Sequence, residues 1–98
     1  MTLITLHEAE IEFYESIAHY ELKEAGLGIR FRDEAEAVVN WISRNPEVPR
    51  LRHKGYRRVN FPVFQHYVAY IIRGNVIWIV AIAHGHRRPE FWLERLKP

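Results

Sequence analysis

Cysteine is absent from this 98-residue chain, which excludes a disulfide, a thiolate nucleophile and a thiolate zinc site. No stretch reaches the roughly 18 consecutive apolar residues of a membrane span. The first residues also lack the charged and apolar regions of a secretory signal. These absences predict a protein of the cytoplasm that does not cross a membrane.

Acidic residues are scarce in the second half of the chain, although the formal net charge is only +2. Residues 1–49 hold 4 Lys or Arg and 10 Asp or Glu, a net of −6. Residues 50–98 hold 10 and 2, a net of +8, with four of the six histidines. Such a basic half favours an acidic partner or a phosphate backbone. The alternative is that the two halves fold together and neutralise each other.

Hydrophobic periodicity predicts two helices in the acidic half. The first spans roughly residues 8–24, and the second runs from about 28 to 44, where Asn45 precedes a proline. The second has the clearer apolar face, made by Phe31, Ala35, Val38, Val39 and Ile42. The segment "AGLG" (25–28) predicts a tight turn, so the helices form an antiparallel hairpin.

Strands are predicted at the start of the chain and throughout the basic half. "TLITL" (2–6) predicts an edge strand, and further strands are expected at 56–61, 64–72 and 76–83. "RGNV" (73–76) predicts a hairpin turn. "VIWIVAIA" (76–83) is apolar on both faces, which favours a central strand covered on both sides.

The fold class is therefore α+β, in a single domain over residues 1–98 with the order β-α-α-β-β-β. The helical hairpin packs on one face of a mostly antiparallel four-stranded sheet. The other face is open, or is covered by a partner or by the C-terminal segment, which begins a short helix or tail. We expect no cofactor.

The stretch "AHGHRRPEFW" (83–92) concentrates the candidate chemistry. His84 and His86 lie on the same side of a strand, but only His53 and His66 are available as further metal ligands, so we expect no metal. A basic surface whose histidines titrate near neutral pH is favoured. Phe91 and Trp92, beyond the last strand, either anchor the tail by packing or contact a partner.

The residue types also allow phosphodiester cleavage, with cations for the phosphate and imidazoles for proton transfer. That alternative uses Arg57 or Arg58, His84, His86 and Arg87. Arg57 and Arg58 are adjacent on a strand and point to opposite faces. One reaches the open face, and the other lies beneath the helices or at an edge, where a helix glutamate is available; which is which stays open.

The ordered set of segments resembles the RelE/ParE superfamily of type II toxin–antitoxin toxins, and most closely its ParE-like branch. Residues 8–49 are similar to its helical hairpin, with the pattern "YE…GLG..F..E…I..NP". "YRRVNF" (56–61) and "IAHGHRRPEFW" (82–92) are similar to its basic sheet and its common ending. The resemblance implies a small toxin that is neutralised by a cognate antitoxin.

Within this superfamily, RelE-like members cleave mRNA on the ribosome and ParE-like members inhibit DNA gyrase. Arg87 matches an arginine of the nucleases after the last strand. Their arginine on the preceding strand is not matched, since "QHYVAY" (65–70) offers His66 and Tyr67 instead. Their C-terminal tyrosine is replaced by Phe91, Trp92 and Leu93, so the resemblance favours gyrase inhibition.

We therefore predict a target-binding surface formed by Arg58, Arg87, Arg88, Phe91 and Trp92. Contacts with an acidic antitoxin, by an added strand or a helix in a groove, are predicted at Tyr14, Arg52, Lys54 and Arg58. A ribosome-dependent mRNA endoribonuclease and a non-toxic antitoxin-binding protein are the alternatives. A homodimer and a toxin–antitoxin hetero-oligomer both remain open.

Overall fold

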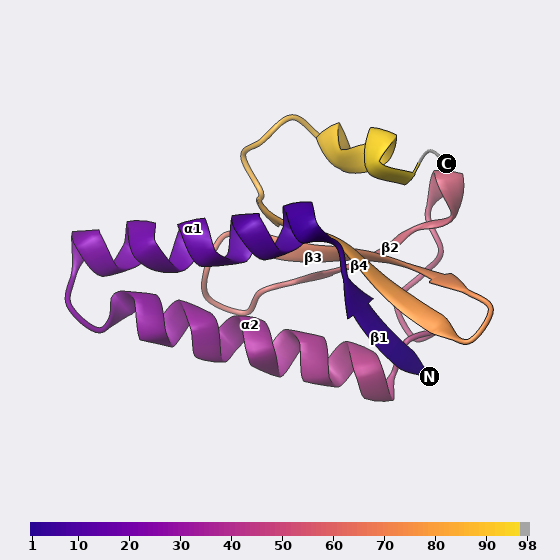
Figure 1. The fold of residues 1–98 in the computed structure, drawn as a ribbon, viewed down its shortest axis with the longest axis horizontal. Coiled ribbons are helices and arrows are strands. Elements are labelled where there is room, and N and C mark those ends of the chain that lie inside the picture. Colours follow the sequence, from indigo (N-terminus) through magenta and orange to yellow (C-terminus); the bar gives the residue numbers. More distant parts are fainter. Residues whose placement is uncertain (97–98) are drawn as a thin grey trace.

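The computed structural model describes residues 1–96 (Figure 1). Its elements are β1 (Thr2–Thr5), α1 (His7–Lys23), α2 (Leu27–Arg44), β2 (Arg57–Asn60), β3 (His66–Arg73), β4 (Val76–His84) and the 3-10 helices η1 (His53–Gly55) and η2 (Phe91–Leu96). The predicted order is confirmed, with element ends displaced by two residues or fewer. No helix within residues 1–96 is long and apolar enough to cross a membrane.

The four strands form one sheet in the order β1-β4-β3-β2. β1 pairs in parallel with β4, while the β4–β3 and β3–β2 pairs are antiparallel. The prediction of a mostly antiparallel sheet with β1 at an edge is therefore confirmed. The long β3–β4 hairpin forms the centre, and its two strands carry most of the buried side chains of the sheet.

The turn between α1 and α2 explains the "GLG" of residues 26–28. Gly26 has a φ of 90°, a left-handed conformation that favours glycine. The Glu21 carboxylate, on α1, accepts hydrogen bonds from the backbone N–H groups of Gly26 and Gly28, at 2.9 and 3.0 Å. A Cβ atom on Gly28 would lie 2.5 Å from the Ile17 carbonyl oxygen, so only glycine lets the helices approach this closely.

The face of the sheet beneath the two helices holds the first apolar core (Figure 1). The helix α2 contributes the predicted stripe, and Phe31, Ala35 and Ile42 are at most 1 % exposed. Opposite them lie Val68 and Tyr70 of β3 and Ile77, Ile79 and Ile82 of β4. Phe31 sits at the centre of an aromatic group and stacks on Tyr20 and Phe61, with ring centroids 5.3 and 5.4 Å apart.

The other face of the sheet holds a second apolar core and is not open. η2 covers it, with Phe91, Trp92, Leu93 and Leu96 packed against Tyr56, Tyr67, Ala69, Ile71, Val80, Ala81 and Ala83. Of the two coverings considered, a partner and the C-terminal segment, the C-terminal segment is the one observed. The prediction that β4 is covered on both sides is confirmed.

A bulge in β4 is the point at which contacts from α1, on one face of the sheet, and from η2, on the other, meet. Ala69 pairs with Ala81 and Tyr70 with Ile79, so Val80 is an extra residue, and Val80 and Ala81 both face the second core. Arg95 of η2 donates a hydrogen bond to the Val80 carbonyl oxygen at 3.0 Å. Glu12 of α1 accepts one from the Ile82 N–H at 3.1 Å, and Glu12 and Arg95 form an ion pair at 2.9 Å.

The Glu12–Arg95 ion pair is a direct contact between opposite charges of the acidic and basic halves. Three ion pairs occur within residues 1–96, and only Glu12–Arg95 joins residues 1–49 to residues 50–98. Mutual neutralisation by direct pairing is thus confined to one contact. Most of the basic half therefore keeps its charge available to solvent and partners.

Candidate functional site

The loop after β4 carries three consecutive exposed basic residues, His86, Arg87 and Arg88. The loop turns sharply because the Gly85 N–H donates to the Gln65 carbonyl at 2.8 Å. The His86 N–H donates to Nδ1 of His84 at 3.0 Å. These contacts hold the loop at the end of the β3–β4 hairpin, so its cations project from the sheet.

Two arginines near this loop are oriented by aromatic rings. The Arg87 guanidinium lies 3.8 Å from the centre of the Phe91 ring, and that of Arg58 lies 3.9 Å from the Tyr67 ring. Arg58 also donates two hydrogen bonds to Oδ1 of Asn60. Such stacking restricts the rotamers of both arginines while leaving their charge uncancelled.

Arg57 and Arg58 point to opposite faces, as strand geometry predicts. Arg58 is paired in register with Ala69 and shares the face of the second core, whereas Arg57 is paired with Tyr70 on the face of the helices. No glutamate partner is found for Arg57 among residues 1–96: its Nε and Nη1 atoms are buried there without a hydrogen bond. Arg57 is thus on the wrong face to act with Arg58.

Trp92 is part of the second core and presents no usable surface, since it is only 1 % exposed. Its indole N–H donates to the Tyr67 hydroxyl at 2.9 Å, and its ring meets Tyr56 edge-on at 4.5 Å. Of the two roles considered for Trp92, packing is the one its placement supports. It therefore leaves the predicted target surface, while the neighbouring Phe91 remains partly exposed.

Glu90 ties the start of η2 to the loop before β2. Its carboxylate accepts a hydrogen bond from the Tyr56 hydroxyl at 2.7 Å and lies 3.0 Å from Nε2 of His53. Burial and then the Glu90 carboxylate raise the pKa of Tyr56 above its ordinary value. Glu90 has a φ of 59°, an unusual backbone conformation for a non-glycine residue, which this pair of contacts holds in place.

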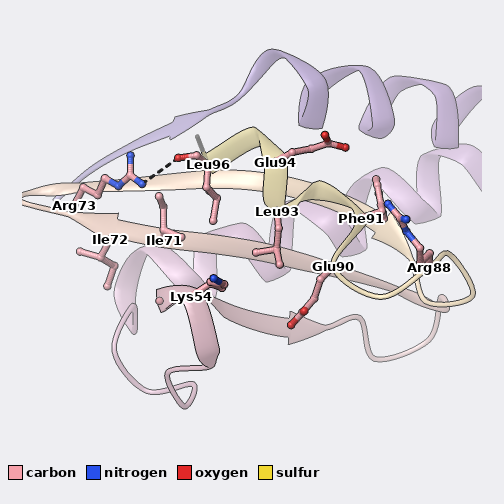
Figure 2. Close-up of a pocket in the computed structure, with 11 residues that line it drawn as sticks. Lys54, Ile71, Ile72, Arg73, Arg88, Glu90, Phe91, Leu93, Glu94 and Leu96 are labelled. Atoms are coloured by element: carbon pink, nitrogen blue, oxygen red, sulfur yellow. Dashed lines mark hydrogen bonds between the residues drawn. The ribbon is translucent and has the colours of Figure 1, made fainter. Parts of the chain in front are cut away.

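A groove of about 780 Å³ lies between η2, η1 and the end of β3 (Figure 2). Its apolar lining includes Ile71 and Leu93, and its charged lining consists of the cations Lys54, Arg73 and Arg88 and the carboxylates Glu90 and Glu94. Arg73 donates a hydrogen bond to the Leu96 carbonyl at 3.4 Å. Among the predicted antitoxin contacts, Lys54 lines this groove, whereas Tyr14 lines another one of about 410 Å³ between α1 and α2. The structure does not bring these two residues together.

The histidines form a chain of rings rather than a metal site. The His84 ring lies 5.0 Å from that of His66 and 4.8 Å from that of His86. Burial, then the neighbouring His84 and His19, lower the pKa of His66 to about 4. Burial also lowers the pKa of His84, followed by His86, Lys23 and His19. Within residues 1–96 no three His, Asp or Glu side chains are placed to hold a metal ion.

The residues of the nuclease alternative converge only in part. The His84 and His86 rings lie close together, and Arg58 lines a hollow of about 390 Å³ with His86, but Arg57 lies beneath the helices. The two phenols next to η2, those of Tyr56 and Tyr67, are each 3 % exposed and are bonded to Glu90 and Trp92. The arrangement offers charge for binding, and of the two arginines considered only Arg58 lies near a histidine.

The fold defines a class of protein, the small α+β domains in which a helical hairpin packs on a mixed four-stranded sheet. A solved structure described as "Chromosomal ParDE TA system from P. aeruginosa" is similar to this chain with a TM-score of 0.66 and 16 % sequence identity, over 86 % of this chain and 95 % of that chain. No curated protein sequence matches the chain.

The particular family follows from the sequence. Residues 4–89 match the family model described as "ParE toxin of type II toxin-antitoxin system, parDE". The chain belongs to the ParE toxin family, as the resemblance of its motifs implied.

Sequence reasoning missed Glu12, Glu90 and Arg95, which fix the C-terminal segment to the rest of the molecule. Each was one charged residue among many, and no motif distinguished it. The one signal was the scarcity of carboxylates in the basic half, where Glu90 and Glu94 are the only two. An isolated carboxylate among cations is a candidate for a specific pairing.

Proposed function

We propose that this ParE-family toxin acts in the cytoplasm by binding DNA gyrase and blocking its activity, and that a cognate antitoxin neutralises it. The observation that carries the proposal is the set of stacked and exposed cations around residues 85–91, with the apolar ring of Phe91 beside them. Such a surface is suited to gripping a partner rather than to cutting a phosphodiester.

The proposed target surface consists of Arg58, Arg87, Arg88 and Phe91. Arg87 and Phe91 form a stacked pair with a charged and an apolar part, a combination that is common in energetically dominant interface contacts. Arg88 is exposed beside them on the rim of the groove in Figure 2. The arginines supply orientation and rate of association, and Phe91 supplies apolar contact.

The proposed antitoxin contact combines charge with an apolar groove. The groove of Figure 2 combines apolar side chains with three cations and two carboxylates, of which Glu90 is already paired with His53, so its excess of cations fits an acidic segment with apolar side chains at intervals. Arg52 and Lys54 lie in the loop at one end of this groove. Tyr14, 63 % exposed, marks a second contact on the helical hairpin, so one antitoxin must reach around the molecule to use both.

Supercoiling of relaxed plasmid by purified gyrase tests the proposal. The full-length protein should inhibit supercoiling in proportion to its concentration, and Arg87→Ala combined with Arg88→Ala should require at least tenfold more protein. Arg30→Ala, which removes an exposed arginine of α2, is the matched control and should inhibit like the unaltered protein. Gyrase that keeps full activity at a large excess of toxin would rule out the proposal. Codon-spaced cuts in mRNA on translating ribosomes, detected by primer extension, would replace it with the nuclease alternative.

A further inference from the structure

A crevice of about 350 Å³ between α1 and the end of β4 is separate from the groove of Figure 2. Its basic and polar lining comes from Ser16, His19, Lys23, His66, His84 and Arg87. These residues belong to α1, to the start of β3 and to the end of β4 and the loop that follows. Hydrogen-bond donors on three segments thus converge on one hollow.

The two formal cations of this crevice, Lys23 and Arg87, form no ion pair within residues 1–96. Two carboxylates also line it: Glu12, which is paired with Arg95 and bonded to the Ile82 N–H, and Glu15. After burial, the groups that lower the pKa of His84 are all basic: His86, Lys23 and His19. A hollow in which basic groups perturb one another in this way is a candidate ligand site.

One donor of the crevice is set by a hydrogen bond. Because Nδ1 of His84 accepts the His86 N–H at 3.0 Å, the neutral ring carries its proton on Nε2, which can donate. The Ser16 hydroxyl lies 3.5 Å from Nε2 of His66. Lys23 of α1 and Arg87 of the loop after β4, whose guanidinium also stacks on Phe91, supply formal charge.

We propose that this crevice binds a phosphate group. A phosphate carries a charge of about −1.5 to −2 near neutral pH and three strong acceptor oxygens, which suits two cations and several neutral donors better than a single carboxylate does. The crevice volume is close to the lower end of ligand pockets, about 300 Å³, so it admits the phosphate and a small part of what carries it.

The formal charge of this site near neutral pH comes from Lys23 and Arg87, because burial lowers the pKa of His66 to about 4 and also lowers that of His84. The titratable and charged groups that face the site are Glu12, Glu15, His19, Tyr20 and Lys23 of α1, His66 of β3, His84 of β4, His86 and Arg87 of the loop, and Arg95 through its pair with Glu12. The basic groups around His84 lower its pKa, and the negative charge of a bound phosphate opposes this effect. We therefore expect His84 to take up a proton when phosphate binds.

The test is a titration of the full-length protein with inorganic phosphate at constant ionic strength, followed by the NMR signals of the histidine rings. We expect saturable shifts at His19 and His84. Lys23→Gln should weaken binding about tenfold, since a hydrogen bond to a charged group contributes at least that factor. Arg30→Gln, an equally exposed cation of the neighbouring helix, should leave the affinity unchanged. Non-saturable shifts, or equal weakening by both substitutions, would overturn the proposal.

Adenosine 5′-monophosphate and adenosine, used as further probes, identify the source of the phosphate. Tighter binding of the monophosphate than of inorganic phosphate points to a nucleotide, and equal affinity points to free phosphate. Binding of adenosine as tight as that of the monophosphate would also overturn the proposal. No gyrase takes part in this measurement, so its failure leaves the proposed function standing, and failure of the supercoiling test leaves the crevice standing.

Discussion

On one face of the sheet the apolar core lies beneath two helices of 17 and 18 residues, and on the other it lies beneath a six-residue 3-10 turn. The first cover is regular secondary structure with a continuous apolar stripe. The second cover is short and buries one large side chain, Trp92. Hydrogen bonds of Arg95 and Glu90 connect this cover to the rest of the molecule. The difference teaches that a small domain can bury both faces of its sheet without a second layer of helices.

The two covers also differ in what they leave for function. The hairpin contributes the acidic residues and its own groove, while the C-terminal turn leaves its cations and Phe91 at the surface around a buried tryptophan. The predictions below ask whether each cover stabilises its core in the way the contacts indicate.

The largest loss of stability is expected for Phe31→Ala in the first core. Phe31 is fully buried at the centre of the aromatic group, so the cavity left by its removal should cost about 4 kcal/mol. Urea unfolding followed by circular dichroism measures this. Leu22→Ala is the control, since Leu22 is 90 % exposed and should change stability by less than about 0.5 kcal/mol.

Trp92→Ala should cost about 3 kcal/mol and release the C-terminal turn from the sheet. The loss is smaller than for Phe31 because a short terminal segment can detach without unfolding the helices. Trp92→Phe keeps the apolar ring and loses only the hydrogen bond to Tyr67, so it should cost much less. Equal effects of the two substitutions in urea unfolding would mean that burial is not what holds the turn.

Gly28→Ala should cost about 2 kcal/mol by forcing the helices apart at their turn. The added Cβ meets the Ile17 carbonyl and the Glu21 side chain, and backbone at that distance cannot move aside cheaply. Thermal unfolding detects the loss. Ala25→Gly, the reverse exchange in the same turn, adds no atom to the contact and is the control. A Gly28→Ala protein as stable as the original would contradict the close approach.

A pH dependence of stability is expected from His66 at the edge of the first core. Its pKa is lowered to about 4, so the folded state holds it neutral while the unfolded chain protonates it below its ordinary value near 6.5. The stabilisation of the folded state by neutral His66 is complete above about pH 6.5. This part of the free energy of unfolding is lost as the pH falls towards 4, by at most about 1.4 kcal/mol per pH unit.

Stability measured between pH 4 and 7 tests the sign. His66→Gln should flatten the slope relative to the original protein, and His7→Gln, at an exposed histidine, should keep it. Stability that rises on acidification in this range would show that His66 gains, rather than loses, from protonation.

The two covers also show which parts of the structure could be predicted from the sequence. Helix periodicity at Phe31, Ala35 and Ile42 predicted the first core, because a long element repeats its apolar positions many times. The order of helices and strands along the chain and the hairpin turn at Gly74 followed from similar local rules. The ParE-like motifs predicted the family to which the chain belongs.

The C-terminal turn has no such repetition, and Trp92 was for that reason assigned to a surface that it does not reach. Its burial depends on Tyr67 and Tyr56, 25 and 36 residues away along the chain, and on the Glu12–Arg95 pair across 83 residues. Strand alternation separated Arg57 from Arg58 but could not say which face the helices would cover. Contacts of this kind are set by tertiary packing and leave no local pattern.

The most direct test of the account is hydrogen exchange of the tryptophan indole N–H groups, because the burial of Trp92 separates the core from the proposed target surface. The chain has three tryptophans, and Trp41 is 36 % exposed while Trp92 is 1 % exposed and bonded to Tyr67. We predict that one indole signal exchanges far more slowly than that of Trp41 and disappears in Trp92→Phe. A Trp92 signal that exchanges as fast as a free indole would contradict the sealed second face and return Trp92 to the surface.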